Sequence, residues 1–228
     1  MPIIIGKFVI GNRSATPRRR LTESQCKRPR GLLGRFVLWN MNSRHSRVTD
    51  WGLSHVAIRP SDVVLDVGCG GGRTVAKLAA IAAQGKVCGV DFSPASVAMA
   101  RNLNTQGIAA GRVDIREASV SQLPFADGTF DVVTAVETHF WWPDLKNDMR
   151  EVFRVVKPAG AIAVIAEIYR GANTATAQLA EKYIPLSGMA LLSADEHREL
   201  LHHAGFTDVQ IFTQKSWICA TGKKRLPT

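Results

Sequence analysis

The stretch Val63-Val64-Leu65-Asp66-Val67-Gly68-Cys69-Gly70-Gly71-Gly72-Arg73 decides the fold of this chain. Its apolar run, with one acidic residue near the end, predicts a buried strand, and the glycines after it predict a tight turn. A helix-compatible run from Thr74 to Ala83 follows at once. Glycine permits positive φ and leaves room for a ligand beside the backbone, and the free N–H groups of a helix N-terminus favour an anionic or strongly polar group. The stretch therefore predicts a strand, a ligand-binding turn and a helix.

Strand and helix patterns alternate over the rest of the chain. Strands are predicted at 63–67, 86–91, 113–117, 130–136 and 161–166, with helices at 74–83, 95–105, 143–156, 173–183 and 194–204. Residues 157–160 are predicted to form a helix-to-strand turn, and the neighbouring runs 207–213 and 217–221 predict a hairpin. Such alternation is typical of a doubly wound α/β domain with a parallel sheet, on which ligands bind outside the carboxyl ends of the strands.

The chain has 228 residues and a formal net charge of +10, and most of that charge lies at its beginning. Residues 1–30 hold eight basic residues and one acidic residue, a net +7, so the remaining 198 residues carry only +3. A basic tail on a nearly balanced domain makes nucleic-acid binding unlikely. We predict a basic, disordered extension over residues 1–30, a helical cap or lid over 31–59 and a ligand-binding domain over 60–228.

Cysteine and histidine spacing favours a reducing, cytoplasmic location without a metal centre. The four cysteines form no CxxC pair, and no HxxxH with an acidic partner occurs. No apolar run reaches the roughly 18 residues that a membrane span requires. The sequence does not define an oligomeric state.

The spacing within the glycine turn narrows its ligand. Gly68, Gly70 and Gly72 form GxGxG, whereas the third glycine of a dinucleotide-binding GxGxxG would stand where Arg73 is. No phosphate-binding GxxxxGK[ST] is present. Asp91 ends the second predicted strand, where a carboxylate can accept hydrogen bonds from both ribose hydroxyls of an adenosine.

With these features the chain resembles the class I S-adenosylmethionine-dependent methyltransferases, in particular their small-molecule, methyltransferase type 11-like branch. Four blocks in order carry the resemblance, over roughly residues 60–166: 64–72, 89–93, 123–133 and 154–160. The resemblance implies a Rossmann-like, mostly parallel seven-stranded sheet with an antiparallel C-terminal hairpin. It also implies S-adenosylmethionine as cofactor and a small-molecule methyl acceptor.

The resemblance also implies roles for individual residues. Asp66 and the glycine-turn backbone would hold the methionine part of the cofactor, Asp91 the ribose, and Phe92 would flank the adenine. Ser119 stands where relatives often carry an acid that contacts the adenine, so backbone bonds are expected there instead. The implied cofactor-binding set is Asp66, Gly68, Cys69, Gly70, Gly72, Asp91, Phe92, Ala118, Ser119, Val120 and Val136. Ala159 departs from the usual Lys-Pro-Gly-Gly block.

The methyl acceptor is expected to face the segment after strand 130–136. Glu137 or His139 could serve there as general base, although a hydrogen-bonded loop histidine is an equally good interpretation of His139. The candidate substrate contacts are Trp39, His45, Trp51, Trp141 and Trp142. The tryptophans could equally be packing residues.

Two other functions fit parts of the pattern. A nicotinamide-dependent oxidoreductase could use a similar sheet, but the GxGxG spacing and Asp66 two residues before Gly68 argue against it. The other alternative is an RNA methyltransferase that uses the basic tail, or a non-catalytic binding module.

Overall fold

The computed structural model describes residues 4–5, 8–9, 46–183 and 189–226. Its main sheet consists of seven strands, namely β3 (Val63–Val67), β4 (Lys86–Asp91), β5 (Val113–Glu117), β6 (Phe130–Val136), β7 (Val156–Ala166), β8 (Thr207–Gln214) and β9 (Trp217–Lys223). Their order is β5-β4-β3-β6-β7-β9-β8. The first five are parallel, and β9 pairs antiparallel with both β7 and β8. The predicted doubly wound sheet with its antiparallel C-terminal hairpin is confirmed.

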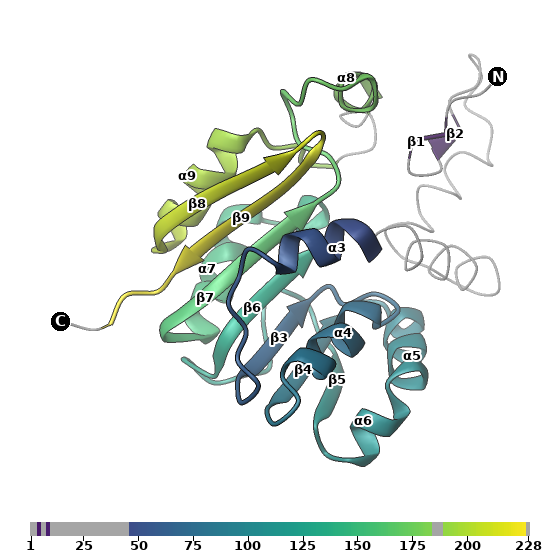
Figure 1. Cartoon of the computed structure of the whole chain (residues 1–228), viewed down its shortest axis with the longest axis vertical. Coiled ribbons are helices and arrows are strands. Elements are labelled where there is room, and N and C mark those ends of the chain that lie inside the picture. The colour runs from purple at the N-terminus through teal and green to yellow at the C-terminus, as the bar shows by residue number, and fades with distance from the viewer. Residues whose placement is uncertain (1–3, 6–7, 10–45, 184–188, 227–228) are drawn as a thin grey trace.

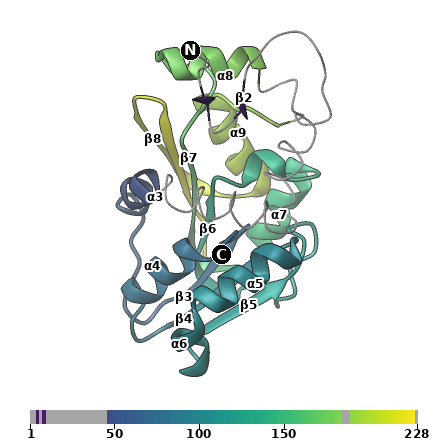
Figure 2. The same cartoon turned by 90° about the vertical axis from the view of Figure 1, so that its right-hand side faces the viewer.

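Helices cover both faces of this sheet (Figures 1 and 2). The helices are α3 (Ser46–Leu53), α4 (Arg73–Ile81), α5 (Pro94–Leu103), α6 (Thr105–Ala109), α7 (Leu145–Val155), α8 (Ala175–Tyr183), α9 (Ala194–Ala204) and the 3₁₀ helix η1 (His139–Trp141). One apolar core joins α3, α4 and α5 to the sheet, and a second joins α7 and α9 to the opposite face. Burial on both faces explains why β6 is almost wholly apolar.

Local sequence sets where several helices begin. Ser93 caps α5 and is followed by Pro94 at its first position, where a proline loses no helical hydrogen bond. Ser193 and Glu196 form a reciprocal capping box at the start of α9, and Gly205 ends that helix with a φ of 110°. The start of α5 follows strand β4 and the start of α9 pairs with the segment after β7, so both lie at the carboxyl edge of the sheet.

The predicted turn at residues 157–160 is wrong, because β7 begins five residues earlier than expected. Phe130 pairs with Val156, and Val132 pairs next with Ala161, so the intervening residues bulge out of the strand without ending it. Ala159, within this bulge, has a φ of 62°, a left-handed conformation that favours glycine. The short helix α6 was not predicted either.

Little of the predicted N-terminal extension and cap is described. Ile4–Ile5 (β1) and Phe8–Val9 (β2) pair as short antiparallel strands. Residues 10–45, including Trp39 and His45, lie outside the described residues. Among the described helices, none is both long and apolar enough to cross a membrane. In the same part of the chain, no three His, Cys, Asp or Glu side chains are grouped to hold a metal ion.

Candidate cofactor and acceptor site

A buried carboxylate lies beneath the glycine turn. Asp66 belongs to β3 and is 1% exposed, and its Oδ1 accepts a 2.8 Å hydrogen bond from the Thr134 hydroxyl on the neighbouring strand β6. Burial raises the pKa of Asp66 to about 7. The hydrogen bond from Thr134 partly opposes this rise, and the charge of Asp91 adds a smaller contribution to it. A carboxylate held in this way has a strong preference for a cationic ligand group.

The glycine turn depends on its glycines for different reasons. Gly68, Gly70 and Gly72 all have positive φ, of 72°, 52° and 82°. A Cβ on Gly68 would lie 2.0 Å from the Thr138 hydroxyl, whereas a Cβ on Gly70 would meet nothing within 4 Å. The first glycine therefore permits close contact with the segment after β6, and the second leaves open space beside the backbone.

Asp91 joins the turn to the end of β4. Its Oδ2 accepts a 2.9 Å hydrogen bond from the Gly70 N–H, and its Oδ1 accepts one of the same length from the Ser93 N–H. Burial raises the pKa of Asp91, and these N–H groups oppose that shift. The Ala118 N–H donates to the backbone oxygen of Asp91, so the segment after β5 begins beside it. Three strand ends thus meet at one edge of the sheet.

The remaining residues of the predicted cofactor-binding set lie at this edge too. Phe92 follows Asp91 and is 42% exposed, which leaves its ring free to flank a ligand. Cys69 and Val120 are buried, Ser119 is exposed, and Val136 ends β6.

These residues fit S-adenosylmethionine. The open space at Gly70 accommodates a ligand against the turn, and the buried Asp66 carboxylate suits the methionine amino group. Asp91 lies at the end of β4, where its carboxylate suits vicinal ribose hydroxyls.

The segment after β6 holds both predicted catalytic residues. Glu137 has a φ of 56°, and its backbone N–H donates to the Ile165 oxygen at the end of β7. Its side-chain carboxylate accepts a hydrogen bond from the Glu167 N–H. His139, two residues on, is 2% exposed and lies in η1. Positive φ at a non-glycine residue is strained, and such strain concentrates at functional sites.

Of the tryptophan candidates that the structure describes, two belong to the segment after β6 and one lies on α3. Trp141 and Trp142 are partly buried, and Trp142 packs against the core beneath α7. Trp51 lies on α3 with its ring centroid 5.8 Å from that of Trp217 and 4.9 Å from that of His55.

Sequence reasoning missed Thr134, Thr138 and His197. Thr134 is the polar residue within an otherwise apolar stretch of β6, and this interruption is a signal that could have been used. Thr138 and His197 carry no comparable signal, because their roles arise from contacts with Gly68 and His139 far away in sequence.

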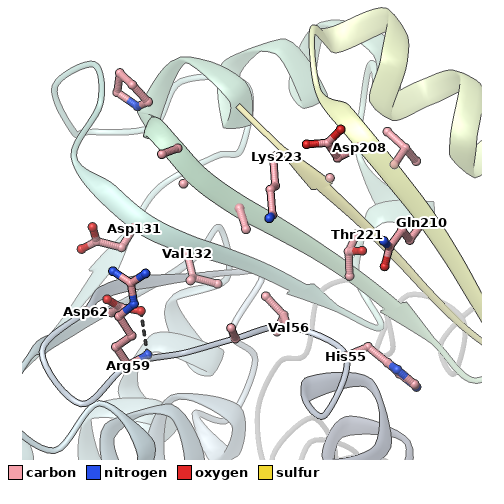
Figure 3. Close-up of a pocket in the computed structure, with 17 residues that line it drawn as sticks. His55, Val56, Arg59, Asp62, Asp131, Val132, Asp208, Gln210, Thr221 and Lys223 are labelled. Atoms are coloured by element: carbon pink, nitrogen blue, oxygen red, sulfur yellow. Dashed lines mark hydrogen bonds between the residues drawn. The ribbon is translucent and has the colours of Figure 1, made fainter. Parts of the chain in front are cut away.

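A hollow lies at the opposite edge of the sheet (Figure 3). It has a volume of about 900 Å³ and lies between the segment 55–62, the starts of β6 and β8 and the end of β9. Asp62 there accepts a 2.7 Å hydrogen bond from the Arg59 N–H, and Asp131 pairs with Lys157. None of the predicted site residues lines this hollow, so it is separate from the glycine turn.

Comparison with known proteins identifies relatives of this chain. Residues 65–164 match the family described as "Methyltransferase domain". An O-methyltransferase of Penicillium expansum, cnsE, is 31% identical over 148 residues, or 65% of this chain and 53% of that protein. The methyltransferase GfsG of Streptomyces halstedii is 31% identical over 185 residues, or 79% of this chain and 66% of that protein. The chain thus spans between about half and two thirds of the length of these relatives.

Solved structures show the same fold. A S-adenosylmethionine-dependent methyltransferase from Aquifex aeolicus superposes with a TM-score of 0.67 at 18% identity, covering 82% of this chain and 95% of that one. The family match and the fold together define an S-adenosylmethionine-dependent methyltransferase domain. This chain carries such a domain, at residues 65–164 and their surroundings, and S-adenosylmethionine is its cofactor.

Proposed function

We propose that this chain transfers the methyl group of S-adenosylmethionine to a small-molecule acceptor. The observation that carries the proposal is the meeting of Asp66, the open backbone at Gly70 and Asp91 at one edge of the sheet. Asp66 suits an ammonium group, the open backbone at Gly70 suits a ligand lying against the turn, and Asp91 suits a ribose.

The chain's own residues bind and orient, while the cofactor supplies an activated methyl on its sulfonium sulfur. Asp66 would hold the methionine amino group and Asp91 the ribose hydroxyls. Phe92 would flank the adenine, and the backbone at Ala118, Ser119 and Val120 would contact its edge. Fixing the cofactor in this way leaves the acceptor to be aligned behind the methyl group, where good orientation can supply several kcal/mol.

The acceptor is proposed to lie against the segment 137–142. Contact between Thr138 and Gly68 supports this placement, since it brings that segment against the cofactor turn. Glu137 and His139 are the proposed general-base candidates, and Trp141 and Trp142, with Trp51 on α3, are the proposed wall. The name O-methyltransferase, given to the Penicillium relative, favours an acceptor that reacts through oxygen.

A cytoplasmic location is part of the proposal. Cys69, Cys88 and Cys219 are free thiols in the described structure, and such thiols suit a reducing compartment. Residues 1–30 are proposed to be an extension outside the catalytic unit.

The proposal is tested by incubating the purified chain with S-adenosylmethionine labelled in its methyl group and a panel of small hydroxylated metabolites. Transfer of label to at least one of them, abolished in the Asp66→Asn variant, is the expected result. Label transfer to RNA alone, lost when residues 1–30 are deleted, would overturn the small-molecule assignment.

A further inference from the structure

Two buried histidines form a pair behind the segment after β6. Nε2 of His139 lies 3.1 Å from Nε2 of His197 on α9, and each side chain is 2% exposed. On the far side of the pair, Nδ1 of His197 lies 2.7 Å from the backbone oxygen of Ser193. The pair therefore links the proposed acceptor segment to the first turn of α9.

Hydrogen-bond chemistry fixes the proton positions in this chain. A carbonyl oxygen only accepts, so Nδ1 of His197 carries a proton. Burial lowers the pKa of both histidines, so both rings are neutral at physiological pH and Nε2 of His197 is bare. The contact between the two Nε2 atoms then requires the proton of His139 to lie on its own Nε2. As a result, Nδ1 of His139 keeps an unprotonated lone pair.

That lone pair has no partner in the described part of the chain. Nδ1 of His139 is out of contact with solvent and makes no hydrogen bond to any described residue. Buried polar atoms in native proteins are nearly always hydrogen-bonded, and an unmet one calls for an explanation such as a missing ligand. The group that would satisfy this atom is a hydrogen-bond donor.

The start of α9 fixes the position of Ser193, whose carbonyl oxygen contacts His197. The Ser193 hydroxyl accepts from the Glu196 N–H at 3.2 Å, and the Ser193 N–H donates to the Glu196 carboxylate at 2.8 Å. Arg170 pairs in turn with that carboxylate. Ser193 therefore presents its carbonyl oxygen to His197 from a fixed position.

We propose that His197 is a positioning residue that locks His139 in the tautomer with a bare Nδ1, and that this atom accepts the O–H of the methyl acceptor. The inference rests on the proposed function and narrows the acceptor to a hydroxyl or phenol that donates a hydrogen bond. As the methyl carbon–sulfur bond breaks and the carbon–oxygen bond forms, the hydroxyl proton passes to Nδ1 of His139. The products are a methyl ether and a neutral thioether, with the proton held on Nδ1 of His139, which must be deprotonated again before the next turnover.

The tautomers can be measured without any turnover. Long-range proton–nitrogen correlation spectra of the ¹⁵N-histidine-labelled chain at pH 7.5 are expected to show His139 protonated on Nε2 and His197 on Nδ1. His139 protonated on Nδ1, or charged, would overturn the proposal even if methyl transfer were demonstrated. Because this measurement needs neither cofactor nor acceptor, a failure of the histidine proposal can be told apart from a failure of the proposed function.

Variants at position 197 separate positioning from simple packing. His197→Phe keeps the volume but removes the acceptor for His139, and we expect kcat to fall at least tenfold with the KM for S-adenosylmethionine unchanged. His197→Gln can still accept from Nε2 of His139 and should restore most of kcat and the His139 tautomer. His202→Gln is the matched control, since His202 lies on the same helix but bonds the backbone oxygen of Phe206 instead of His139, and it should leave kcat and its pH profile unchanged.

Equal kcat in wild type, His197→Phe and His202→Gln would contradict the positioning role. If His197→Phe does not fold, His197→Gln is compared with wild type instead. A His197→Gln chain that is folded and fully active but has lost the His139 tautomer would also contradict the proposal. Absence of S-adenosylmethionine binding in the wild type would instead refute the proposed function.

Discussion

The Thr134 hydroxyl donates a 2.8 Å hydrogen bond to Asp66 across the neighbouring strands β6 and β3. A neutral hydroxyl orients the carboxylate without supplying a compensating charge. Since Asp66 is buried, its ionised form is costly in the free protein and becomes favourable when a cationic group arrives. The ligand site is therefore built at the expense of stability, which can be measured.

The first prediction concerns the stability of the Asp66→Asn variant. Burial raises the pKa of Asp66 from 3.8 to about 7, so between these values the folded state binds more protons than the unfolded state. The free energy of unfolding of the wild type therefore falls as pH rises from 4 to 7, by on the order of 4 kcal/mol from this group. Asn carries no charge, so the free energy of unfolding of the variant should rise relative to that of the wild type between pH 4 and 7. The relative gain should be a few kcal/mol at pH 8.

Urea unfolding of both proteins at pH 4 and pH 8 measures this difference. Asp114→Asn is the control, because Asp114 lies on β5 in a partly exposed ion pair with Arg116. A difference between wild type and Asp66→Asn that is the same at both pH values would contradict the account of Asp66.

The second prediction concerns the pH dependence of cofactor binding. A ligand ammonium requires ionised Asp66, which is a minority species below pH 7. Affinity for S-adenosylmethionine should therefore rise roughly tenfold between pH 6 and 7.5, with up to one proton released on binding at pH 6. Calorimetry in buffers of different ionisation enthalpy measures that proton, and an affinity independent of pH would speak against an Asp66–ammonium contact.

The third prediction compares two glycines with similar backbones. Gly70 (φ 52°) and Gly111 (φ 69°) would each place a Cβ in open space. Substitution by Ala should cost about 1–2 kcal/mol of stability at either site, because both hold a left-handed conformation. Only Gly70→Ala should weaken S-adenosylmethionine binding, by tenfold or more, since its Cβ fills the space beside the cofactor turn. Equal affinities in the two variants would remove Gly70 from the site.

The fourth prediction concerns the bulge at the start of β7. Ala159 holds a φ of 62°, so Ala159→Gly relieves backbone strain in the folded state. This gain exceeds the free-energy cost of the greater conformational entropy that glycine gives the unfolded chain. Thermal unfolding should show a stability gain of up to about 1 kcal/mol with cofactor affinity unchanged. Ala161→Gly, at an extended position of the same strand, should instead lose about 0.5–1 kcal/mol. A loss of stability in Ala159→Gly would mean that the bulge is unstrained.

Much of the fold follows from local sequence, because its signals are local. The strand Phe130–Val136 and the helix Ala194–Ala204 have the predicted bounds, since one is a mostly apolar run and the other begins with a capping box and ends at glycine. The start of β7 was missed because a strand continues through Lys157–Gly160 only if β6 lies alongside, and that pairing is not encoded locally.

The same distinction holds at the site. The glycine turn and Asp91 could be located from the sequence, because their backbone geometry and strand-end position leave a pattern. The partnership of His139 with His197 could not, because 58 residues separate them and only the packing of α9 brings them together. Side-chain roles that depend on tertiary contacts need the structure.

Calorimetric titration of the whole chain with S-adenosylmethionine, and separately with NAD, tests the central claim most directly. Asp91→Ala is the informative variant, because its carboxylate is proposed to hold the ribose, and a hydrogen bond to a charged group is worth roughly 1.5–3 kcal/mol. We expect S-adenosylmethionine to bind the wild type, NAD not to bind, and affinity to fall by at least tenfold in Asp91→Ala but not in Asp114→Ala. Tight NAD binding with no heat from S-adenosylmethionine would contradict the account.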